Sequence, residues 1–458
     1  MTDALLSAEP PRRPTAALGE LLRLAWPVVL ARVGIMTMGL VDVIVVGRHS
    51  AEQLAYQALA LAPISVVVTT VVGLLMGVQV MTSRLIGEGR PEETVAVLRR
   101  GCVYALQLGF GALLIMALLG PWAMRNAGLE PGLGEGASLP LVIFALSMPA
   151  YLLSVVGQLF LEAQGRPGAG AAAMIVANVV NLALNLWLVP GASGLPVEGA
   201  AASAWATFFA RGLLAVVIFA FIFAKAGVTL KALLRHGRGH AADAREQRKI
   251  GLGAGSSYFI EVTAFAAMTF VAGWLGGLEV AAWTVILNIA AVIFMGPLGL
   301  SSATAVLVGR DYGAGQPHGV RQAGFLGMGV TAVLTGLIAL GVWLFDEPLA
   351  RAYTSDPQAV AIAVSGLTIA CLFFVADGLQ VVAAQSLRAA ADVWWPTVMH
   401  IVSYGVVMLP LGWFLAHPAG LGVNGIVWAV VVASLISAGM LTTRFWFVSG
   451  RKLAPAVA

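Results

Sequence analysis

The sequence predicts an all-α integral membrane protein whose twelve transmembrane helices form two six-helix lobes related by a parallel internal repeat. Three observations predict this fold: the hydropathy, the number and length of the apolar segments, and the similarity of the two halves. Of the 458 residues, 59% are hydrophobic and 10% are charged, and the mean hydropathy is +0.91. A soluble domain carries about 25% charged residues. Because no soluble core absorbs this excess of apolar surface, the composition indicates many membrane spans.

Twelve apolar segments are long enough to cross a bilayer, which takes about 20 helical residues. They cover residues 21–47, 57–84, 95–122, 139–161, 168–190, 199–224, 251–276, 281–308, 322–345, 360–386, 396–416 and 423–447. The glycines and prolines inside them are tolerated in transmembrane helices. The polar, proline-rich N-terminus lacks the apolar core of a signal peptide, so we expect the first helix to be retained.

The second half of the chain repeats the first at an offset of 226 residues, which we expect to continue without a gap. It aligns the motif SRLIGEGRP with GRDYGAGQP, and it pairs Arg84 with Arg310, Gly87 with Gly313, Leu161 with Leu387, Trp187 with Trp413 and Gly199 with Gly425. Six spans per half is an even number, so both halves enter the membrane in the same direction, as in many secondary transporters. We expect a tail at 1–20, an N-lobe at 21–224, a linker at 225–249, a C-lobe at 250–447 and a tail at 448–458.

Lysine and arginine predict the orientation, since they are enriched in cytoplasmic loops. If the N-terminus is cytoplasmic, the inside segments hold most of these residues, among them the basic linker and the span ends with Arg84, Arg310 and Arg388. The outside loops hold only Arg48, Arg125 and Arg351. We therefore expect both termini and the linker to be cytoplasmic. The net charge of +4 does not indicate nucleic-acid binding, because the basic residues follow this topology.

Several functional classes are disfavoured by the motifs. Cys102 and Cys371 lie in different apolar segments, which disfavours a disulfide framework or a metal-binding cysteine cluster. The sequence contains no HExxH motif, no Walker loop and no Ser/His pair suited to a membrane enzyme. His400 is the one histidine well inside a span, where a lone histidine usually has a packing role. A channel is disfavoured because a two-lobe repeat suits alternating access, so the sequence favours a transporter.

Five charged residues lie well inside the expected spans: Asp42, Glu261, Asp377, Arg32 and Arg211. Placing such a side chain in a bilayer costs about 2.5–3.5 kcal/mol on insertion scales, so it faces protein or a water-filled cavity and usually has a function. Glu162 lies at the cytoplasmic end of span 4, where solvation is sufficient to account for it.

The first candidate site surrounds Asp42 in the N-lobe. Asn178, Asn181 and Asn185 follow the spacing i, i+3, i+7, which places three amides on one face of span 5. Thr207 lies at a comparable depth in span 6. These oxygen ligands suit a small hard cation such as Na⁺, and the carboxylate alone suits a proton. The alternative is an interhelical hydrogen-bond network with only a packing role.

The second candidate site lies in the C-lobe. Glu261 in span 7 and Asp377 in span 10 fall near mid-membrane, and two acids in one cavity favour binding of a proton or a cation such as Na⁺. Phe265, four residues after Glu261, suits an organic cation by cation–π attraction, and we also expect Phe294 in the substrate cleft. The alternative is a static ion pair of each acid with Arg211 or Arg32.

The repeat separates these acids from the scaffold. At the offset of 226, Asp42 aligns with Met268, Glu261 with Ile35 and Asp377 with Tyr151. The scaffold is therefore duplicated, whereas the intramembrane acids are not. Residues kept only for helix packing are expected to recur more readily in both halves.

Five motifs carry a resemblance that covers nearly the whole chain. They are LAWPVVLARVGIMTMGLVDVIVVGR in span 1, LIGEGRPEE after span 2, NVVNLALNLWLVPGASGLPVEGAAASAWAT in spans 5 and 6, SSYFIEVTAFAAMTF in span 7, and VADGLQVVAAQSLRAA in span 10. With these motifs the chain resembles the multidrug and toxic compound extrusion (MATE) family, and within it the bacterial NorM-type branch. Arg32 in span 1 departs from the family pattern, and we expect it at a gate or in a pair between the lobes.

This resemblance implies a cleft between the lobes and Na⁺- or H⁺-coupled antiport that exports small organic cations. It implies coupling roles for Asp42 with Asn181 and Asn185, and for Glu261 with Asp377. It also implies a monomeric, multi-pass protein of the bacterial inner membrane that is not an enzyme and needs no cofactor beyond the coupling ion. The alternative is a lipid-linked sugar or lipid flippase of related fold, which would need a more basic cavity for pyrophosphate.

Overall fold

The computed structural model describes residues 14–126, 132–191, 194–234, 241–354 and 356–450. The expected tails before residue 14 and after residue 450, and residues 235–240 of the expected linker, lie outside this part. Eleven described helices are long and apolar enough to cross a membrane, and one bent helix pair supplies a twelfth span. The predicted all-α architecture of twelve spans is therefore confirmed.

The first half of the chain supplies six spans. They are built from α1 (Pro14–His49), α2 (Ala51–Leu75), α3 (Gly77–Gly87), α4 (Thr94–Arg125), α5 (Leu133–Leu146), α6 (Met148–Ala163), α7 (Pro167–Leu188) and α8 (Gly199–Lys225), with the 3₁₀ turn η1 (Pro91–Glu93) before α4. Helices α5 and α6 form the bent span, with a 41° change of direction. Pro149, which has no N–H to donate, follows directly after this break.

The second half repeats this plan after the short helix α9 (Leu230–Leu234). Its helices are α10 (Ala241–Leu275), α11 (Gly277–Gly313), α12 (Pro317–Leu344), α13 (Asp346–Arg351), α14 (Pro357–Ala389), α15 (Trp394–His400), α16 (Leu409–Ala416) and α17 (Gly422–Ser449). Between α15 and α16 lies a π-helical segment, η2 (Ile401–Met408). The three pieces form one span, and π segments inside α-helices are frequent at functional sites.

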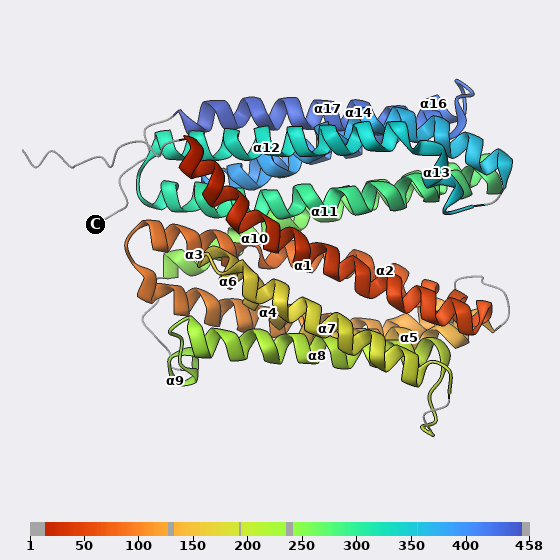
Figure 1. The fold of residues 1–458 in the computed structure, drawn as a ribbon, viewed down its shortest axis with the longest axis horizontal. Coiled ribbons are helices and arrows are strands. Elements are labelled where there is room, and N and C mark those ends of the chain that lie inside the picture. The colour runs from red at the N-terminus through yellow and green to blue at the C-terminus, as the bar shows by residue number, and fades with distance from the viewer. Residues whose placement is uncertain (1–13, 127–131, 192–193, 235–240, 355, 451–458) are drawn as a thin grey trace, which may run out of the picture.

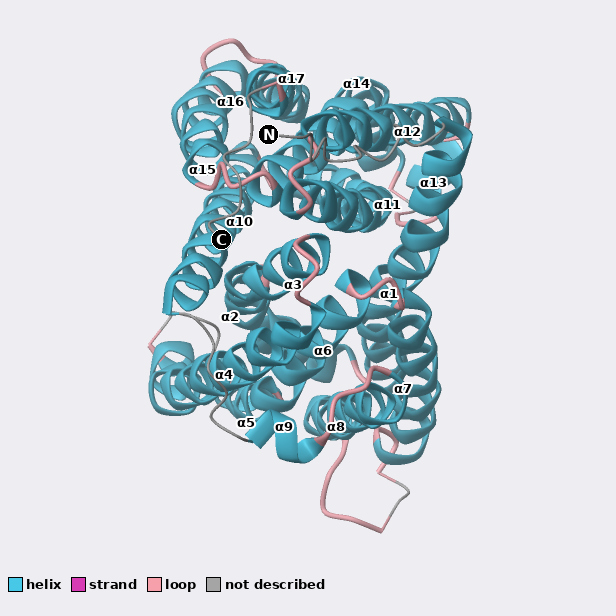
Figure 2. Ribbon diagram, turned by 90° about the vertical axis from the view of Figure 1, so that its left-hand side faces the viewer, coloured by secondary structure: helices cyan, strands magenta, loops and turns pink. Residues whose placement is uncertain are grey.

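The two halves form two lobes that lie side by side (Figure 1). Helix α1 runs obliquely between them, and its first turns pack into an apolar cluster of the C-terminal half through Leu21, Leu24 and Ala25. The lobes also meet where α2 packs on α10 and where α3 packs on α11. Figure 2 views the end of the bundle at which α3, α11 and α17 finish, which we call the basic end.

At the basic end, the repeated motif after span 2 brings the two lobes together. We call Arg84, Gly87, Arg310 and Gly313 the repeat interface. A Cβ atom at Gly87 would overlap the carbonyl oxygen of Arg310, and one at Gly313 would overlap that of Arg84. Two residues that the repeat pairs therefore make the same contact in opposite directions. Only glycine permits backbones to approach so closely.

The two arginines of the repeat interface also make equivalent contacts, each with a backbone carbonyl oxygen of the opposite lobe. Arg84 donates from Nε to the carbonyl oxygen of Ala389 at 3.0 Å, and Arg310 donates from Nη2 to that of Ala163 at 2.8 Å. Each arginine thus binds the last residue of a long helix in the opposite lobe. Ala163 and Ala389 are themselves separated by the repeat offset, so the pseudo-twofold relation extends to the hydrogen bonds.

The expectation of a gap-free register is wrong toward the end of each lobe. Gly199 begins the last helix of the first lobe with a φ of 56°, and Gly422, rather than Gly425, begins its counterpart with a φ of 58°. The backbone N–H after each glycine donates to an equivalent side chain, that of Gln53 in one lobe and Glu279 in the other, at 2.9 Å in both.

The physical reason for the changed register lies in the connection that precedes the last helix of each lobe. The connection from α16 to α17 is shorter than the one from α7 to α8, which lowers the offset at the last helix. The π-helical segment of the eleventh span, Ile401–Met408, takes in more residues per turn than the α-helical span α7, so it changes the offset in the opposite direction. The shorter connection outweighs the π-helical segment.

Candidate functional site

Asp42 forms the centre of a buried polar site in the N-lobe. It lies on α1 with an exposed fraction of 3%. Asn185 of α7 donates from Nδ2 to its Oδ1 at 2.8 Å, and Thr207 of α8 donates from Oγ1 to its Oδ2 at 2.7 Å. Both carboxylate oxygens therefore accept hydrogen bonds from neutral donors, and three helices of one lobe meet at this group.

The three asparagines of α7 have different partners. Asn181 donates to the hydroxyl of Thr207 at 3.4 Å, which places it beside the carboxylate site. Asn178 instead donates to the carbonyl oxygens of Gly34 and Met174, and so it ties α7 to the backbone of α1. Of the four residues expected beside Asp42, the structure places Asn181, Asn185 and Thr207 at the carboxylate site, whereas Asn178 binds elsewhere.

The side-chain oxygens of Asn181 and Asn185 are buried, and they accept no hydrogen bond from the described residues. A buried polar atom without a partner is costly and needs an explanation. Beside Asp42, such oxygens have the ligand chemistry of a hard cation. This arrangement exceeds what helix packing alone requires.

A cavity of about 80 Å³ opens beside Asp42. Ile35, Tyr151, Thr207 and Arg211 are among the residues that line it. Arg211 donates from Nη1 to the hydroxyl of Ser147 at 2.8 Å, and its guanidinium lies 4.6 Å from the centre of the Tyr151 ring. Asp42 and Arg211 thus share a cavity, although no ion pair within 4.0 Å joins these two described residues.

In the C-lobe, Glu261 of α10 and Asp377 of α14 form a second acidic site. Both are partly exposed, in contrast to Asp42. Asp377 accepts at Oδ1 from Gln380 at 3.3 Å and from the hydroxyl of Tyr404 at 3.4 Å. Glu261 lies close enough to Asp377 and Arg388 to interact with their charges.

Tyr404 is a site residue that sequence reasoning missed. It lies in the π-helical segment, and its ring centre is 6.1 Å from that of Phe265. His400, expected to have a packing role, is buried and binds Gln380 at 2.9 Å. The available signal was the spacing of His400 and Tyr404, two polar residues on one face of an apolar span.

The two expected cleft aromatics lie in different places. Phe265 packs in the apolar cluster that contains Met268 and Tyr404, whereas Phe294 packs against the cluster that contains Leu300 and Met328. The structure therefore joins Phe265 to the acidic site of the C-lobe.

The expectation that Arg32 or Arg211 neutralises the C-lobe acids is wrong. Arg32 lies 3.4 Å from Glu162, and Arg211 lies beside the cavity of the N-lobe. Solvation does not account for Glu162 either, because its exposed fraction is 5% and it accepts hydrogen bonds from Gln79 at 2.7 Å and from Ser302 at 2.6 Å. Ser302 belongs to α11, so Glu162 joins the two lobes. No local sequence pattern predicts this long-range contact.

Two arginines that the sequence places in cytoplasmic segments are buried at the basic end. Arg388 has an exposed fraction of 1% and donates to the hydroxyl of Ser257 at 2.7 Å. Arg84 belongs to the repeat interface described above. Carbonyl, hydroxyl and amide oxygens accept hydrogen bonds from these two guanidinium groups, whereas the buried Nε of Arg388 has no partner among the described residues.

The comparisons with known proteins agree with this architecture. The profile of the MatE family matches residues 27–187 and 254–414, which are two segments of equal length, one in each lobe. A probable multidrug resistance protein NorM of Caulobacter vibrioides is 52% identical, with 96% of this chain and 94% of that protein covered. A protein of the same name from Pseudomonas putida is 30% identical over 97% of each chain.

Solved structures show the same fold. One described as the outward-facing conformation of a multidrug resistance MATE family transporter matches with a TM-score of 0.87 and 19% identity, over 94% of this chain and 96% of the other. A eukaryotic MATE transporter matches with a TM-score of 0.84 and 17% identity, over the same shares. The family profile, which matches both lobes, and the relative at 52% identity show that the chain belongs to the MatE family, as a bacterial NorM-type multidrug transporter that is not an enzyme and needs no cofactor.

Proposed function

We propose that this transporter is an antiporter that exports small, mostly cationic organic compounds in exchange for Na⁺ or H⁺. The observation that carries the proposal is that Asp42, Glu261 and Asp377 lie inside spans and form no ion pair with the described residues. Arg388 acts on Glu261 and Arg211 on Asp42 only from beyond ion-pair distance, and a carboxylate at such a place is costly without a close counter-charge. A cation that arrives and leaves supplies that charge in part of the cycle. The multidrug resistance names of the relatives support drugs as the exported class.

We assign the coupling ion first to Asp42. Its carboxylate and the unpartnered oxygens of Asn181 and Asn185 form a set of oxygen ligands suited to Na⁺, and the carboxylate alone can take up a proton. The adjacent cavity of about 80 Å³ has room for an ion with water. Drug-sized ligands occupy pockets of about 300–1,000 Å³, so the drug binds elsewhere in this state.

We assign the organic cation to Glu261 and Asp377. These acids are partly exposed, and Phe265 and Tyr404 place two aromatic rings beside them. An aromatic face attracts a desolvated organic cation, and a carboxylate supplies the opposite charge. Na⁺ or H⁺ competes for the same carboxylates, so uptake of the ion weakens the hold on the drug.

The structure suits one state of an alternating-access cycle. The repeat interface and the Glu162 contacts hold the lobes together at the basic end. If the positive-inside rule sets the orientation, this end faces the cytoplasm, and a cleft between the lobes would open on the opposite, outer side. Release of the drug outward and uptake of the ion then precede separation of the repeat interface. A ligand shifts this equilibrium only through different affinities for the two states.

Transport in a defined system tests the proposal. Purified full-length protein is reconstituted in liposomes, and ethidium movement is followed under a Na⁺ gradient, a pH gradient or neither. We expect uphill ethidium movement under one of the two gradients and none without a gradient. Growth protection of an efflux-deficient strain against ethidium or a fluoroquinolone provides the cellular counterpart. Ethidium movement that is the same with and without the Na⁺ and pH gradients would refute coupling of ethidium transport to either ion.

We also propose that the protein is a monomer of the bacterial inner membrane with both termini and the linker in the cytoplasm. Single cysteines introduced at Gly239 and Gly132, in a variant that lacks Cys102 and Cys371, test the proposed topology. An impermeant maleimide added to intact cells should label the cysteine at Gly132 only. Labelling at Gly239 alone would invert the topology.

A further inference from the structure

Arg388 places a permanent positive charge near the acidic site of the C-lobe. Its Nη2 donates at 2.7 Å to the hydroxyl of Ser257, which precedes Glu261 by four residues and so lies on the same face of α10. Helical side chains lean toward the N-terminus of their own helix. Since α10 begins at the basic end and α14 ends there, the side chains of Glu261 and Arg388 lean toward each other.

No carboxylate of the described residues lies within 4.0 Å of the Arg388 guanidinium group. Its side-chain acceptors are neutral: the hydroxyl of Ser257 and, at 3.2 Å, the amide oxygen of Gln385. Glu261 is the acid whose charge acts on it, from a greater distance. Arginine is almost never fully buried without a paired charge. The acidic site therefore supplies the counter-charge of Arg388.

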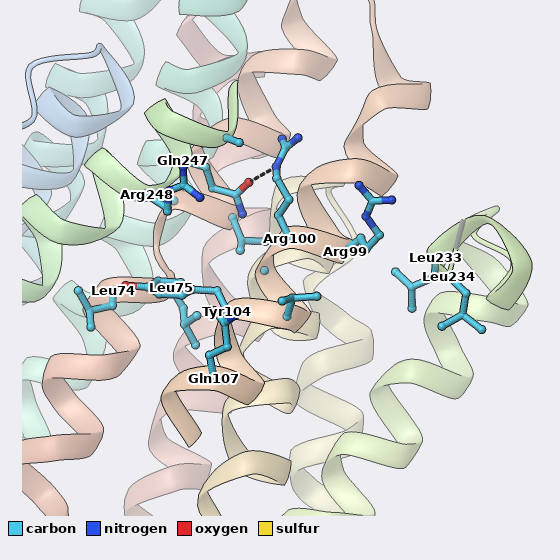
Figure 3. A pocket seen from close by; sticks show the side chains of 15 residues that line it. Leu74, Leu75, Arg99, Arg100, Tyr104, Gln107, Leu233, Leu234, Gln247 and Arg248 are labelled. Atoms are coloured by element: carbon cyan, nitrogen blue, oxygen red, sulfur yellow. Dashed lines mark hydrogen bonds between the residues drawn. The ribbon is translucent and has the colours of Figure 1, made fainter. Parts of the chain in front are cut away.

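A pocket of about 480 Å³ at the basic end shows the contrast (Figure 3). Arg100, which lines this pocket, donates to the side-chain oxygen of Gln247 at 2.9 Å. Asp243 and Glu93 lie close enough to act on its charge. Arg100 therefore has acids of its own around it, whereas Arg388 has only the acidic site.

The other arginines near Arg388 have their own carboxylates. Arg84 donates to the backbone carbonyl oxygen of Arg388 at 2.7 Å, and its guanidinium group lies 3.6 Å from Glu246. Arg32, whose charge reaches the same part of α10, lies 3.4 Å from Glu162. Neither arginine therefore takes the place of Arg388 as the counter-charge of the acidic site.

The histidine and the nearer tyrosine of the acidic site are neutral. His400 binds the amide oxygen of Gln380 through Nε2 at 2.9 Å, whereas its buried Nδ1 has no partner among the described residues. A charged imidazole carries a donor on each nitrogen, so a ring with one partner is the neutral form. Tyr404 donates its hydroxyl proton to Asp377. The charge of this region is therefore set by the two acids and Arg388.

We propose that Arg388 determines the charge specificity of the drug site: with Glu261 and Asp377 it leaves one net negative charge, which fits one monovalent cation. This inference rests on the proposed function, in which the two acids bind the exported cation. One ethidium, one Na⁺ or one proton makes the site neutral, so drug and ion exclude each other. A drug and an ion bound together, or a divalent drug, would leave a surplus positive charge in a partly buried site, which is costly.

Equilibrium binding of ethidium to the purified full-length protein tests this charge count. Glu261→Gln should weaken binding by about fivefold or more, since a unit charge acts strongly in a partly buried site. Addition of Arg388→Gln to Glu261→Gln restores one net negative charge and should return the affinity close to the wild-type value. Removal of a residue with only a structural role would not restore binding.

Propidium, a divalent cation with the same aromatic ring system as ethidium, measures the charge preference. Arg388→Gln alone leaves two negative charges, so the affinity for propidium relative to ethidium should rise by about tenfold or more over the wild type. Arg388→Lys keeps the positive charge and should keep the wild-type ratio. The control is Arg351→Gln, which removes an exposed arginine of the same lobe and should also keep that ratio.

The outcomes separate the role of Arg388 from the proposed function. If Glu261→Gln leaves ethidium binding unchanged, the proposed drug site is wrong. If Glu261→Gln weakens binding and the added Arg388→Gln does not restore it, only the role of Arg388 is wrong. Equal shifts of the propidium-to-ethidium ratio in Arg388→Gln and Arg388→Lys would also overturn that role, because shape and not charge would set the preference. The charge-balanced double variant keeps the test valid even if Arg388→Gln alone does not fold.

Discussion

The repeat interface and the acidic sites follow opposite rules. At the repeat interface, Gly87 and Gly313 make the same backbone contact in opposite directions, and Arg84 and Arg310 bind equivalent carbonyl oxygens. In the acidic sites, nothing is mirrored. Asp42 is buried and held by neutral donors, whereas its equivalent in the C-lobe is Met268, a buried apolar residue. The molecule is duplicated where the lobes touch and differs where it carries charge.

The cavity beside Asp42 makes the difference sharper. Ile35 and Tyr151, which line it, are the repeat equivalents of Glu261 and Asp377. Equivalent helix positions therefore face a polar site in both lobes. In the C-lobe these positions carry acids, whereas in the N-lobe they carry Ile35 and Tyr151 and the acid, Asp42, lies at another position. An interface that must close in register benefits from symmetry. Two sites that bind different cations, one small and one organic, require different surroundings.

The largest effect is expected at Asp42. Asp42→Asn keeps the shape of the side chain and removes its charge, so we expect loss of ethidium efflux to the background level at normal expression. Efflux from loaded cells of an efflux-deficient strain measures this. The control is Glu52→Gln, an exposed acid on the outer part of the same lobe. Full resistance in the Asp42→Asn strain would remove this carboxylate from transport and leave only the C-lobe site.

The second prediction separates the acids of the two lobes. In the wild type, ethidium affinity should fall as the pH drops or Na⁺ rises, because either change neutralises the carboxylates of the cleft. Glu261→Gln with Asp377→Asn should weaken binding by about tenfold or more, which corresponds to about 1.4 kcal/mol, and should flatten the ion dependence. Equilibrium binding to purified protein, titrated with each ion, measures both quantities.

Thermodynamic linkage gives a check on this second prediction. If the ion lowers the affinity for ethidium by a given factor, ethidium must lower the affinity for the ion by the same factor. Glu347→Gln, an exposed acid on α13, serves as the control and should behave like the wild type. An unchanged ion dependence in the double variant would place all coupling at Asp42.

The third prediction concerns the symmetric part of the molecule. Gly87→Ala and Gly313→Ala each add a methyl group against a carbonyl oxygen of the other lobe. Overpacking costs about 1–3 kcal/mol, which should shift the equilibrium away from the closed basic end by about 5- to 150-fold. Distances between spin labels on the two lobes report this shift.

Because the interface is symmetric, the two glycine variants should give shifts of similar size. Gly168→Ala at the same end has open space around the new Cβ and should give none. A large shift in only one of the two glycine variants would show that the two contacts, although alike in geometry, contribute unequally to the stability of the closed basic end.

The smallest effects are expected among the asparagines of α7. Asn185→Ala removes one of the two hydrogen bonds to the Asp42 carboxylate and leaves its charge in place, so it should moderately raise the Na⁺ or H⁺ concentration needed to drive ethidium movement in liposomes. Asn181→Ala should have a weaker effect because the hydrogen bond from Asn181 to Thr207 is longer, at 3.4 Å. Asn178→Ala should leave the ion dependence unchanged, since Asn178 binds backbone oxygens only. A change of ion dependence in Asn178→Ala as large as in Asn185→Ala would contradict this ranking.

The helix count, the repeat and the three intramembrane acids could all be predicted from the sequence. Long apolar segments identify spans because a bilayer leaves the backbone no alternative to internal hydrogen bonds. The spacing of the α7 asparagines placed Asn181 and Asn185 near Asp42. The same spacing could not show that Asn178 binds α1, because a shared helix face does not determine which atoms on the neighbouring helix lie opposite.

The order of residues is enough to establish which residues the protein duplicates and which it does not, because alignment of the halves needs nothing more. Which of these residues are in contact depends on the tertiary structure. Glu162 and Ser302 lie far apart in the chain, and Tyr404 reaches Asp377 through a π-helical segment that also shifts the repeat register. Such contacts depend on how helices cross and rotate, which is set by the packing of whole lobes and not by any local pattern.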